Sequence, residues 1–212
     1  MKAIAICGSP RKGWNTDLLL QEALKGAESM GAETEMVYLY DLDYKGCVSC
    51  FGCRVKGAES YRCRYRDALT PVLDKILEAD AVFFGTPIYL EDITGQMSAF
   101  QERLFFPMVS YDDFGKNIFP GKINAAYFFT MNAPREFYES HMKPFLMSRL
   151  RALSHLGGKL EVRASCNTLQ FTDYSRYHTA MFDVADRRRS RAEQFPKELA
   201  EAYEIGRKMM EK

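Results

Sequence analysis

Apolar residues gather in five short runs along the first 165 positions of the chain. The runs at residues 3–7, 81–85 and 123–130 are almost wholly apolar, whereas those at 33–40 and 159–165 mix apolar and polar positions. A continuous apolar run is typical of a strand covered on both faces, and a mixed run is typical of a strand at a sheet edge. The pattern therefore predicts five strands, three of them central.

Helical periodicity fills the intervals between these runs. Residues 16–30 place Leu20, Leu24 and Ala27 on one face, and Gly31 follows as a natural stop. Further helices are predicted from the Thr70-Pro71 start and over residues 94–106. Two more are predicted up to His155 and along the C-terminal stretch, and Pro144 begins or interrupts the former, Pro196 the latter. Strands that alternate with helices predict an α/β fold with a parallel sheet.

Placing the two mixed strands at the edges gives the strand order 2-1-3-4-5. We expect a single domain over residues 1–212, with a cysteine-containing loop at about 46–66 and a helical C-terminal tail at about 184–212. In an open sheet of this order, ligands bind where the first and third strands end. Three loops meet at that edge, at residues 8–16, 86–95 and 131–135.

The first loop has the chemistry of an anion site. Gly8, Ser9 and Pro10 end the first strand, and Asn15 and Thr16 open the following helix. Unpaired backbone N–H groups and the helix dipole both favour a phosphate there, with Arg11 or Lys12 as a cationic donor. The loop contains neither the P-loop motif nor GxGxxG, which disfavours a dinucleotide Rossmann site. The alternative is an ordinary turn with Thr16 as a cap.

The second loop, TPIYLEDITG, carries backbone amides and the ring of Tyr89 to the same edge. A flat heterocycle would suit this loop, because it can stack on the ring and bond to the backbone. Alternatively, Pro87 simply ends the strand and Tyr89 packs on a neighbouring helix.

Composition narrows the class of protein. Of the 212 residues, 47% are hydrophobic and 27% charged, and 29 Lys and Arg against 28 Asp and Glu give a net charge of +1. This balance argues against a nucleic-acid partner, which usually selects a basic excess. No apolar run approaches the roughly 18 residues that would span a bilayer. We therefore expect a cytoplasmic protein with no membrane partner.

Four of the six cysteines lie close together in the sequence. Cys47, Cys50 and Cys53 form a CxxCxxC run, and Cys63 follows after nine intervening residues. Three interpretations stay open: ligands of a 4Fe-4S cluster, thiols without a metal, or a zinc site. Cys7 and Cys166 lie in or beside predicted strands, where core packing is expected.

The remaining polar candidates are weaker. The three histidines share no metal-ligand spacing, so they are expected at the surface or at helix caps: His141, His155 and His178. The basic run at residues 187–191 is typical of a solvated helix face, with the extra phosphate of NADPH as the alternative partner. Aromatic residues between 171 and 182 indicate that the tail crosses another surface, and we expect a homodimer or homotetramer.

Two motifs together carry a family resemblance: GSPRKGWNT after the first strand and ADAVFFGTPIYLEDITGQMSAFQERL around the third. Over roughly the first 135 residues the chain resembles the NADPH-dependent FMN reductases of the flavodoxin-like superfamily, and most closely their iron–sulfur flavoprotein group. The resemblance implies a flavodoxin-like three-layer sandwich with a five-stranded parallel sheet and a bound FMN. It implies phosphate contacts from Ser9, Arg11, Asn15 and Thr16, and a ring bordered by Pro87, Ile88, Tyr89, Leu90, Asp92, Met131 and Asn132.

The resemblance also implies an activity. We expect an FMN-dependent oxidoreductase that moves electrons from NAD(P)H to a quinone, a flavin or a protein acceptor. The cofactor carries such chemistry, so no general acid or base is named. An iron–sulfur flavoprotein acting as electron carrier, with Cys47, Cys50, Cys53 and Cys63 as ligands, is one alternative, although the gap before Cys63 is longer than usual in that group. A non-catalytic protein that binds a phosphate ligand is the other.

Overall fold

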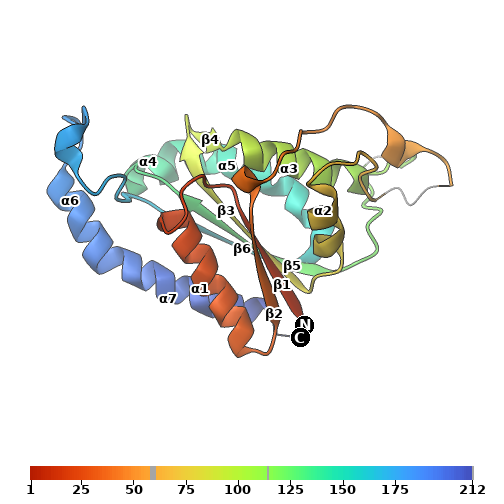
Figure 1. Cartoon of the computed structure of the whole chain (residues 1–212), viewed down its shortest axis with the longest axis horizontal. Coiled ribbons are helices and arrows are strands. Elements are labelled where there is room, and N and C mark those ends of the chain that lie inside the picture. The colour runs from red at the N-terminus through yellow and green to blue at the C-terminus, as the bar shows by residue number, and fades with distance from the viewer. Residues whose placement is uncertain (58–60, 114, 212) are drawn as a thin grey trace.

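In the computed structural model, which describes residues 1–57, 61–113 and 115–211, helices cover both faces of a twisted parallel sheet (Figure 1). The five parallel strands are β1 (Lys2–Cys7), β2 (Glu33–Tyr38), β3 (Ala81–Tyr89), β5 (Ile123–Thr130) and β6 (Gly157–Ser165). Their order is β2-β1-β3-β5-β6, and the short β4 (Asp92–Ile93) pairs only with β3. Counted over the parallel strands, this is the predicted order 2-1-3-4-5, which is therefore confirmed.

The two faces of the sheet differ in the size of their side chains. On one face Ile6, Phe84 and Tyr127 pack under α2 (Thr70–Leu77), α3 (Gly95–Phe105) and α5 (Lys143–Arg149). On the other face small residues such as Ala5 and Ala126 lie under α1 (Asn15–Ser29) and α7 (Phe195–Met209). Because side chains alternate along a strand, each buried strand supplies both cores.

The helices α1 and α7 contact each other at the level of their backbones. A Cβ atom on Gly206 would lie 1.9 Å from the carbonyl oxygen of Ala23, and one on Gly26 would lie 2.0 Å from that of Tyr203. Each glycine thus receives the backbone of the opposite helix. This contact fixes α7 against the helix that follows the first loop.

Two prolines that the sequence placed inside or between helices lie next to π-helical turns. Residues 135–156 run through α4 (Arg135–Phe137), a π turn (Tyr138–Met142), α5 and a 3₁₀ segment. A second π turn (Ser190–Gln194) joins α6 (Val184–Arg189) to α7. Pro144 and Pro196 each occupy the first turn of the helix that follows, where their missing N–H is not needed. Both prolines therefore begin an α-helix within a longer helical stretch.

The third strand is longer than the sequence predicts. It continues past Gly85 to Tyr89 and turns back into β4 as a hairpin. The two-residue turn, Leu90 and Glu91, has φ values of 50° and 65°. Positive φ at both positions is what a type I′ hairpin turn needs, although neither residue is glycine. The second loop is therefore a hairpin held in a backbone conformation that most side chains avoid.

The predicted cysteine loop contains little regular structure. A single 3₁₀ turn (Gly52–Arg54) lies in its described part, and residues 58–60 lie outside the described residues. In the part of the chain that the structure describes, no helix combines the length and the apolar character needed to cross a bilayer.

Candidate functional site

The three predicted loops meet at the carboxyl ends of β1, β3 and β5 and enclose a cavity of about 70 Å³. Nine of the eleven residues predicted to bind the cofactor line this cavity: Ser9, Arg11, Asn15, Thr16, Pro87, Ile88, Tyr89, Met131 and Asn132. Five lining residues were not predicted: Trp14, Thr130, Thr168, Leu169 and Gln170. The loops thus come together at the switch point of the sheet, where ligands of such folds bind.

A carboxylate fixes the first loop to the start of α1. Trp14 is the N-cap, and its side chain makes no capping bond. Instead Asp17, 1% exposed, reaches back, and its Oδ2 accepts the Gly13 N–H at 2.5 Å. Its Oδ1 accepts the Tyr38 hydroxyl at 2.9 Å. Burial and this bond raise the pKa of Tyr38 to about 12. Asp17 therefore ties the first loop to both α1 and β2.

Buried threonines join the three loops to one another. The Thr94 hydroxyl donates to the Gly8 carbonyl at 2.9 Å and so ties the hairpin to the first loop. The hydroxyls of Thr16 and Thr130 lie 2.7 Å apart and connect α1 with the end of β5. All three threonines are at most 4% exposed. Such paired hydroxyls hold the walls of the cavity in one arrangement.

A segment from the C-terminal third forms the remaining wall. The carbonyl of Leu169 accepts Asn15 Nδ2 at 3.0 Å, and the carbonyl of Gln170 accepts a guanidinium N–H of Arg11 at 2.8 Å. The Arg11 guanidinium also stacks 3.6 Å above the ring of Trp14. These residues follow β6, and the carboxyl end of every parallel strand lies at the same sheet edge. That rule was the available sequence signal for them.

Two predicted residues lie away from the cavity. Leu90 forms the tip of the hairpin and is fully exposed. The carboxylate of Asp92 lies 3.2 Å from the guanidinium of Arg149 on α5, so it belongs to a surface ion pair. Neither residue lines the enclosed volume. The hairpin turns both away, because the chain reverses direction directly after Tyr89.

The four clustered cysteines line a second, much smaller cavity of about 20 Å³, together with Arg103 and Phe106. Cys47 and Cys50 are exposed, Cys53 is buried, and all four thiols are free. Arg103 Nε donates to Cys63 Sγ at 2.9 Å. Burial, more than any charge nearby, raises the pKa of Cys53. Within residues 1–57, 61–113 and 115–211, no three Cys, His, Asp or Glu side chains lie so that together they could hold one metal ion.

The other two cysteines pack in the core, as predicted. Cys7 and Cys166 are both buried. Burial raises the pKa of Cys7 to about 12 and that of Cys166 to about 11, so both thiols stay protonated at neutral pH.

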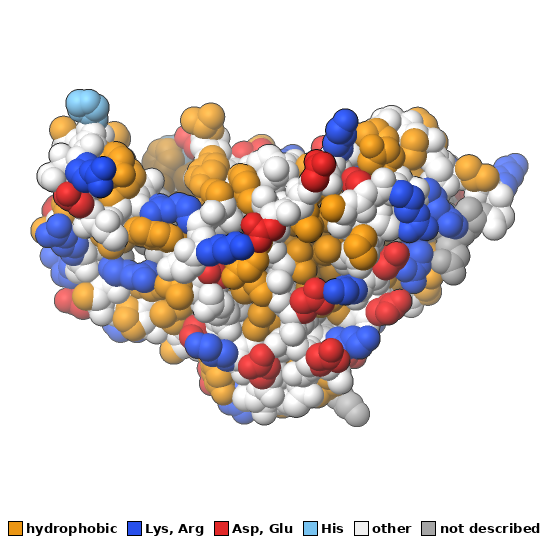
Figure 2. Space-filling view, viewed as in Figure 1, with side chains coloured by type: hydrophobic (Ala, Val, Ile, Leu, Met, Phe, Trp, Pro, Cys, Tyr) orange, Lys and Arg blue, Asp and Glu red, His pale blue; other side chains and the backbone are white. Residues whose placement is uncertain are grey.

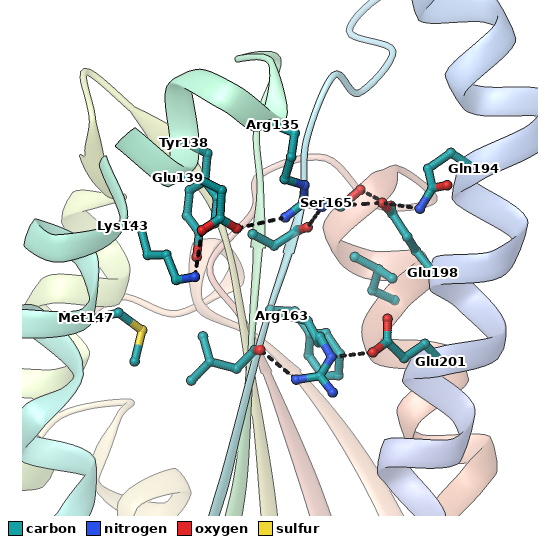
Figure 3. A pocket seen from close by; sticks show the side chains of 14 residues that line it. Arg135, Tyr138, Glu139, Lys143, Met147, Arg163, Ser165, Gln194, Glu198 and Glu201 are labelled. Carbon is teal, nitrogen blue, oxygen red and sulfur yellow. Dashed lines mark hydrogen bonds and ion pairs between the residues drawn. The ribbon is translucent and has the colours of Figure 1, made fainter. Parts of the chain in front are cut away.

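A cavity of about 370 Å³ lies at the outer edge of β6, between α4–α5 and α7 (Figure 3). Its charged side chains pair with one another: Lys143 Nζ lies 2.6 Å from Glu139, Arg163 bonds Glu201, and Ser165 donates to Glu198. Burial, its largest cause, raises the pKa of Glu198. Charged pairs along an edge strand also discourage the addition of a further strand. Because the charged side chains that line this cavity already have partners, we assign it no ligand.

Comparison with known proteins identifies relatives for the N-terminal part. A profile of the NADPH-dependent FMN reductase family matches residues 1–160. An iron-sulfur flavoprotein of Methanocaldococcus jannaschii is 36% identical over 103 residues, which are 49% of this chain and 51% of the relative. Another, of Archaeoglobus fulgidus, is 40% identical over 95 residues, 45% of this chain and 44% of that protein. The chain spans about half the length of the curated relatives it matches.

Solved structures share the fold over the whole chain. An NAD(P)H:quinone oxidoreductase from Methanothermobacter marburgensis has a TM-score of 0.65 at 15% identity, covering 100% of this chain and 98% of the other. An azoreductase from Bacillus anthracis also has a TM-score of 0.65 at 15% identity, with 98% and 99% covered. At this identity the likeness shows the flavodoxin-like fold. The family match spans 160 of the 212 residues, from β1 into β6, and the protein therefore belongs to the NADPH-dependent FMN reductase family.

Proposed function

We propose that this protein is an FMN-dependent oxidoreductase that takes electrons from NAD(P)H and delivers them to a quinone, a flavin or a protein acceptor. The observation that carries the proposal is the convergence of three loops at the switch point of the sheet, in a chain of the FMN reductase family. When bound, FMN supplies the hydride and electron chemistry, and the protein supplies binding and orientation.

The enclosed part of the site fits a phosphate group. Ser9 and Thr16 offer hydroxyls, Asn15 an amide and Arg11 a cation, all at the N-terminus of α1. The enclosed volume of about 70 Å³ is far below the roughly 300–1,000 Å³ of pockets that bury a whole ligand. The flat part of the cofactor therefore belongs along the open rim. There Tyr89, 48% exposed, offers a ring for stacking.

The ring end is assigned to the hairpin and the third loop. Pro87 and Ile88 bring backbone groups and apolar surface beside Tyr89, and Met131 and Asn132 line the same cavity. Leu90 contributes apolar surface only from outside the enclosed volume. Asp92 acts on the hairpin through Arg149 rather than on the ring.

We expect the purified protein to bind FMN tightly enough to keep flavin absorbance through gel filtration, and anaerobic NAD(P)H to bleach it. Ser9→Ala should weaken FMN binding about 10-fold or more, because it removes one hydrogen bond to the charged phosphate, and leave riboflavin binding unchanged. Titration of the apoprotein measures both. Ser148→Ala, on an exposed helix position, is the matched control and should bind FMN normally. A folded protein that binds no flavin would refute the proposal.

A second redox centre at the cysteines is the other candidate. The supporting observation is that Cys47, Cys50, Cys53 and Cys63 all line one cavity. The Arg103 guanidinium bonded to Cys63 would favour negative charge on sulfur. A 4Fe-4S cluster is held by four thiolates, one on each iron atom. Its ligands therefore need not include three side chains around a single ion. We propose these four residues as its ligands.

Anaerobically purified protein should then contain about four irons and as many sulfides per chain. Cys50→Ser should lose most of the iron, because it removes a ligand at the exposed side, while Cys166→Ala should keep it. Iron and sulfide analysis measures both variants. Iron-free protein that still binds FMN would remove the cluster and leave the flavin proposal intact.

A further inference from the structure

The C-terminal helical stretch sends two arginines to the loops of the flavin site. Arg187 Nε donates to Asn132 Oδ1 at 2.6 Å, and a terminal guanidinium nitrogen of Arg191 donates to Asn15 Oδ1 at 2.9 Å. The two are four residues apart and so share a helix face, whereas Arg188 and Arg189 are exposed. Basic side chains gather at the end of the molecule that α6 forms (Figure 2). The basic run at residues 187–191 is therefore only partly a solvated helix face.

Among the described residues Arg191 has no acidic partner, unlike Arg187 and Arg189. Arg187 lies 3.7 Å from Asp186, and Arg189 also pairs with Asp186. Among the described residues, no carboxylate lies within ion-pair distance of Arg191. Its guanidinium stacks 4.3 Å above the ring of Phe195 and is partly buried, and this burial lowers the pKa of Arg191. A partly desolvated cation without a counter-ion favours a nearby anion.

Asn15 connects Arg191 to the cavity where we propose that the cofactor's phosphate binds. Asn15 is the first residue of α1, where backbone N–H groups lack helical partners, and it lines the enclosed cavity. Its amide is held on both sides, by Arg191 at Oδ1 and by the Leu169 carbonyl at Nδ2. Arg11, the cation that lines the cavity, donates to the Gln170 carbonyl and stacks on Trp14. Arg191 therefore adds a second cation at this end, behind Asn15.

We propose that Arg191 binds the phosphate of FMN, so that the C-terminal helical stretch adds a cation to a site lined by the family-matched part, residues 1–160, and by Thr168, Leu169 and Gln170. The inference rests on the proposed function. Arg191 donates charge-assisted hydrogen bonds to phosphate oxygens beside the N-terminus of α1. It thereby selects the phosphorylated flavin over riboflavin, which has the same ring and no phosphate.

The test compares FMN with riboflavin on the apoprotein by fluorescence titration. Arg191→Gln keeps an amide donor near Asn15 and removes the charge, so FMN should bind about 10–100 times more weakly, with riboflavin affinity within twofold. Arg191→Lys should lower the FMN-to-riboflavin affinity ratio by less. Arg188→Gln makes the same charge change at an exposed position one turn away and should change neither affinity more than twofold.

The alternative outcomes are distinct. Unchanged FMN affinity in Arg191→Gln, or an equal loss of FMN and riboflavin, overturns the inference, since the residue would then be absent from the phosphate site or merely hold the helix. If circular dichroism shows that Arg191→Gln does not fold, the ratio for Arg191→Lys decides, and an unchanged ratio overturns it. A folded wild-type protein that binds neither flavin overturns the proposed function and this inference together.

Discussion

Replacing Arg103 with alanine should lower the free energy of unfolding by about 3–5 kcal/mol, the usual cost of removing one partner from a buried ion pair. The Arg103 side chain is 1% exposed, although it carries a full charge. Its guanidinium bonds both oxygens of Asp67, at 2.8 and 3.2 Å, and the carbonyls of Lys45 and Tyr65 at 2.8–2.9 Å. Without it, Asp67 loses its cationic partner and keeps only the backbone N–H groups of Lys45 and Leu69 as donors.

The loss should depend on pH through Asp67. Burial alone would raise the pKa of this carboxyl, but the hydrogen bonds and charge of Arg103 lower it overall. A group whose pKa is lowered in the folded protein stabilises it above the unfolded pKa of about 3.9, and that contribution is lost as the pH falls further. The difference between wild type and Arg103→Ala should therefore be full at neutral pH and shrink below about pH 4.

Urea unfolding at pH 7 and pH 3.5 measures this effect. Arg66→Ala is the matched control, because that side chain is 69% exposed and its ion pair with Asp74 is long, at 4.0 Å. Its effect on the free energy of unfolding should stay within about 0.5 kcal/mol. A loss below about 1 kcal/mol for Arg103→Ala would mean that Asp67 finds another partner. In wild type the pair anchors the cysteine loop to α3, the helix that follows the hairpin.

Gly206→Ala should cost roughly 2–4 kcal/mol, even though alanine gains about 1 kcal/mol over glycine in a helix interior. The new Cβ would lie 1.9 Å from the Ala23 carbonyl oxygen, which is backbone and cannot rotate away. The helices α1 and α7 would have to separate. Because α7 continues into the turn that carries Arg191, FMN binding should weaken as well.

Thermal and urea unfolding of Gly206→Ala, Gly26→Ala, their double variant and a control tests this contact. Gly95→Ala is the control, since no atom lies within 4 Å of its added Cβ, and it should be neutral or slightly stabilising. Gly26→Ala should resemble Gly206→Ala, with its Cβ 2.0 Å from the Tyr203 carbonyl oxygen. The double variant should cost less than the sum, because the first substitution already parts the helices. Full additivity would show that each glycine acts separately.

The sheet and the first loop could be predicted because their signals are local. The continuous apolar runs identified the central strands, and GSPRKGWNT placed small residues and caps where β1 ends. The capping residue was predicted one position too early, as Thr16. In the structure Asp17 accepts the Gly13 N–H, while Asn15 and Thr16 line the cavity. Residue types alone do not tell a capping oxygen from one offered to a ligand.

The hairpin and the two arginines of the C-terminal helical stretch could not be predicted in this way. Leu90 and Glu91 are unusual in a turn that needs positive φ, so the sequence lacked the usual glycine or asparagine. Arg187 and Arg191 looked like surface charges, because helical periodicity is blurred where a π turn changes the phase of the helix. Their partners, Asn132 and Asn15, lie 55 and 176 residues away in the chain. Contacts of that range leave no local trace.

The proposed contribution of the C-terminal helical stretch to flavin binding has a consequence for the biogenesis of the protein. A ribosome delivers β1, α1 and the hairpin long before it delivers α7, whose buried Phe195, Ala202 and Ile205 cover the alanine-rich face of the sheet. During that interval this face is bare, and the first loop lacks the wall formed by Leu169 and Gln170 and the hydrogen bond from Arg191 to Asn15. We therefore expect flavin to be taken up only after residue 191 has left the exit tunnel, and we expect the alanine-rich face to need protection until α7 covers it.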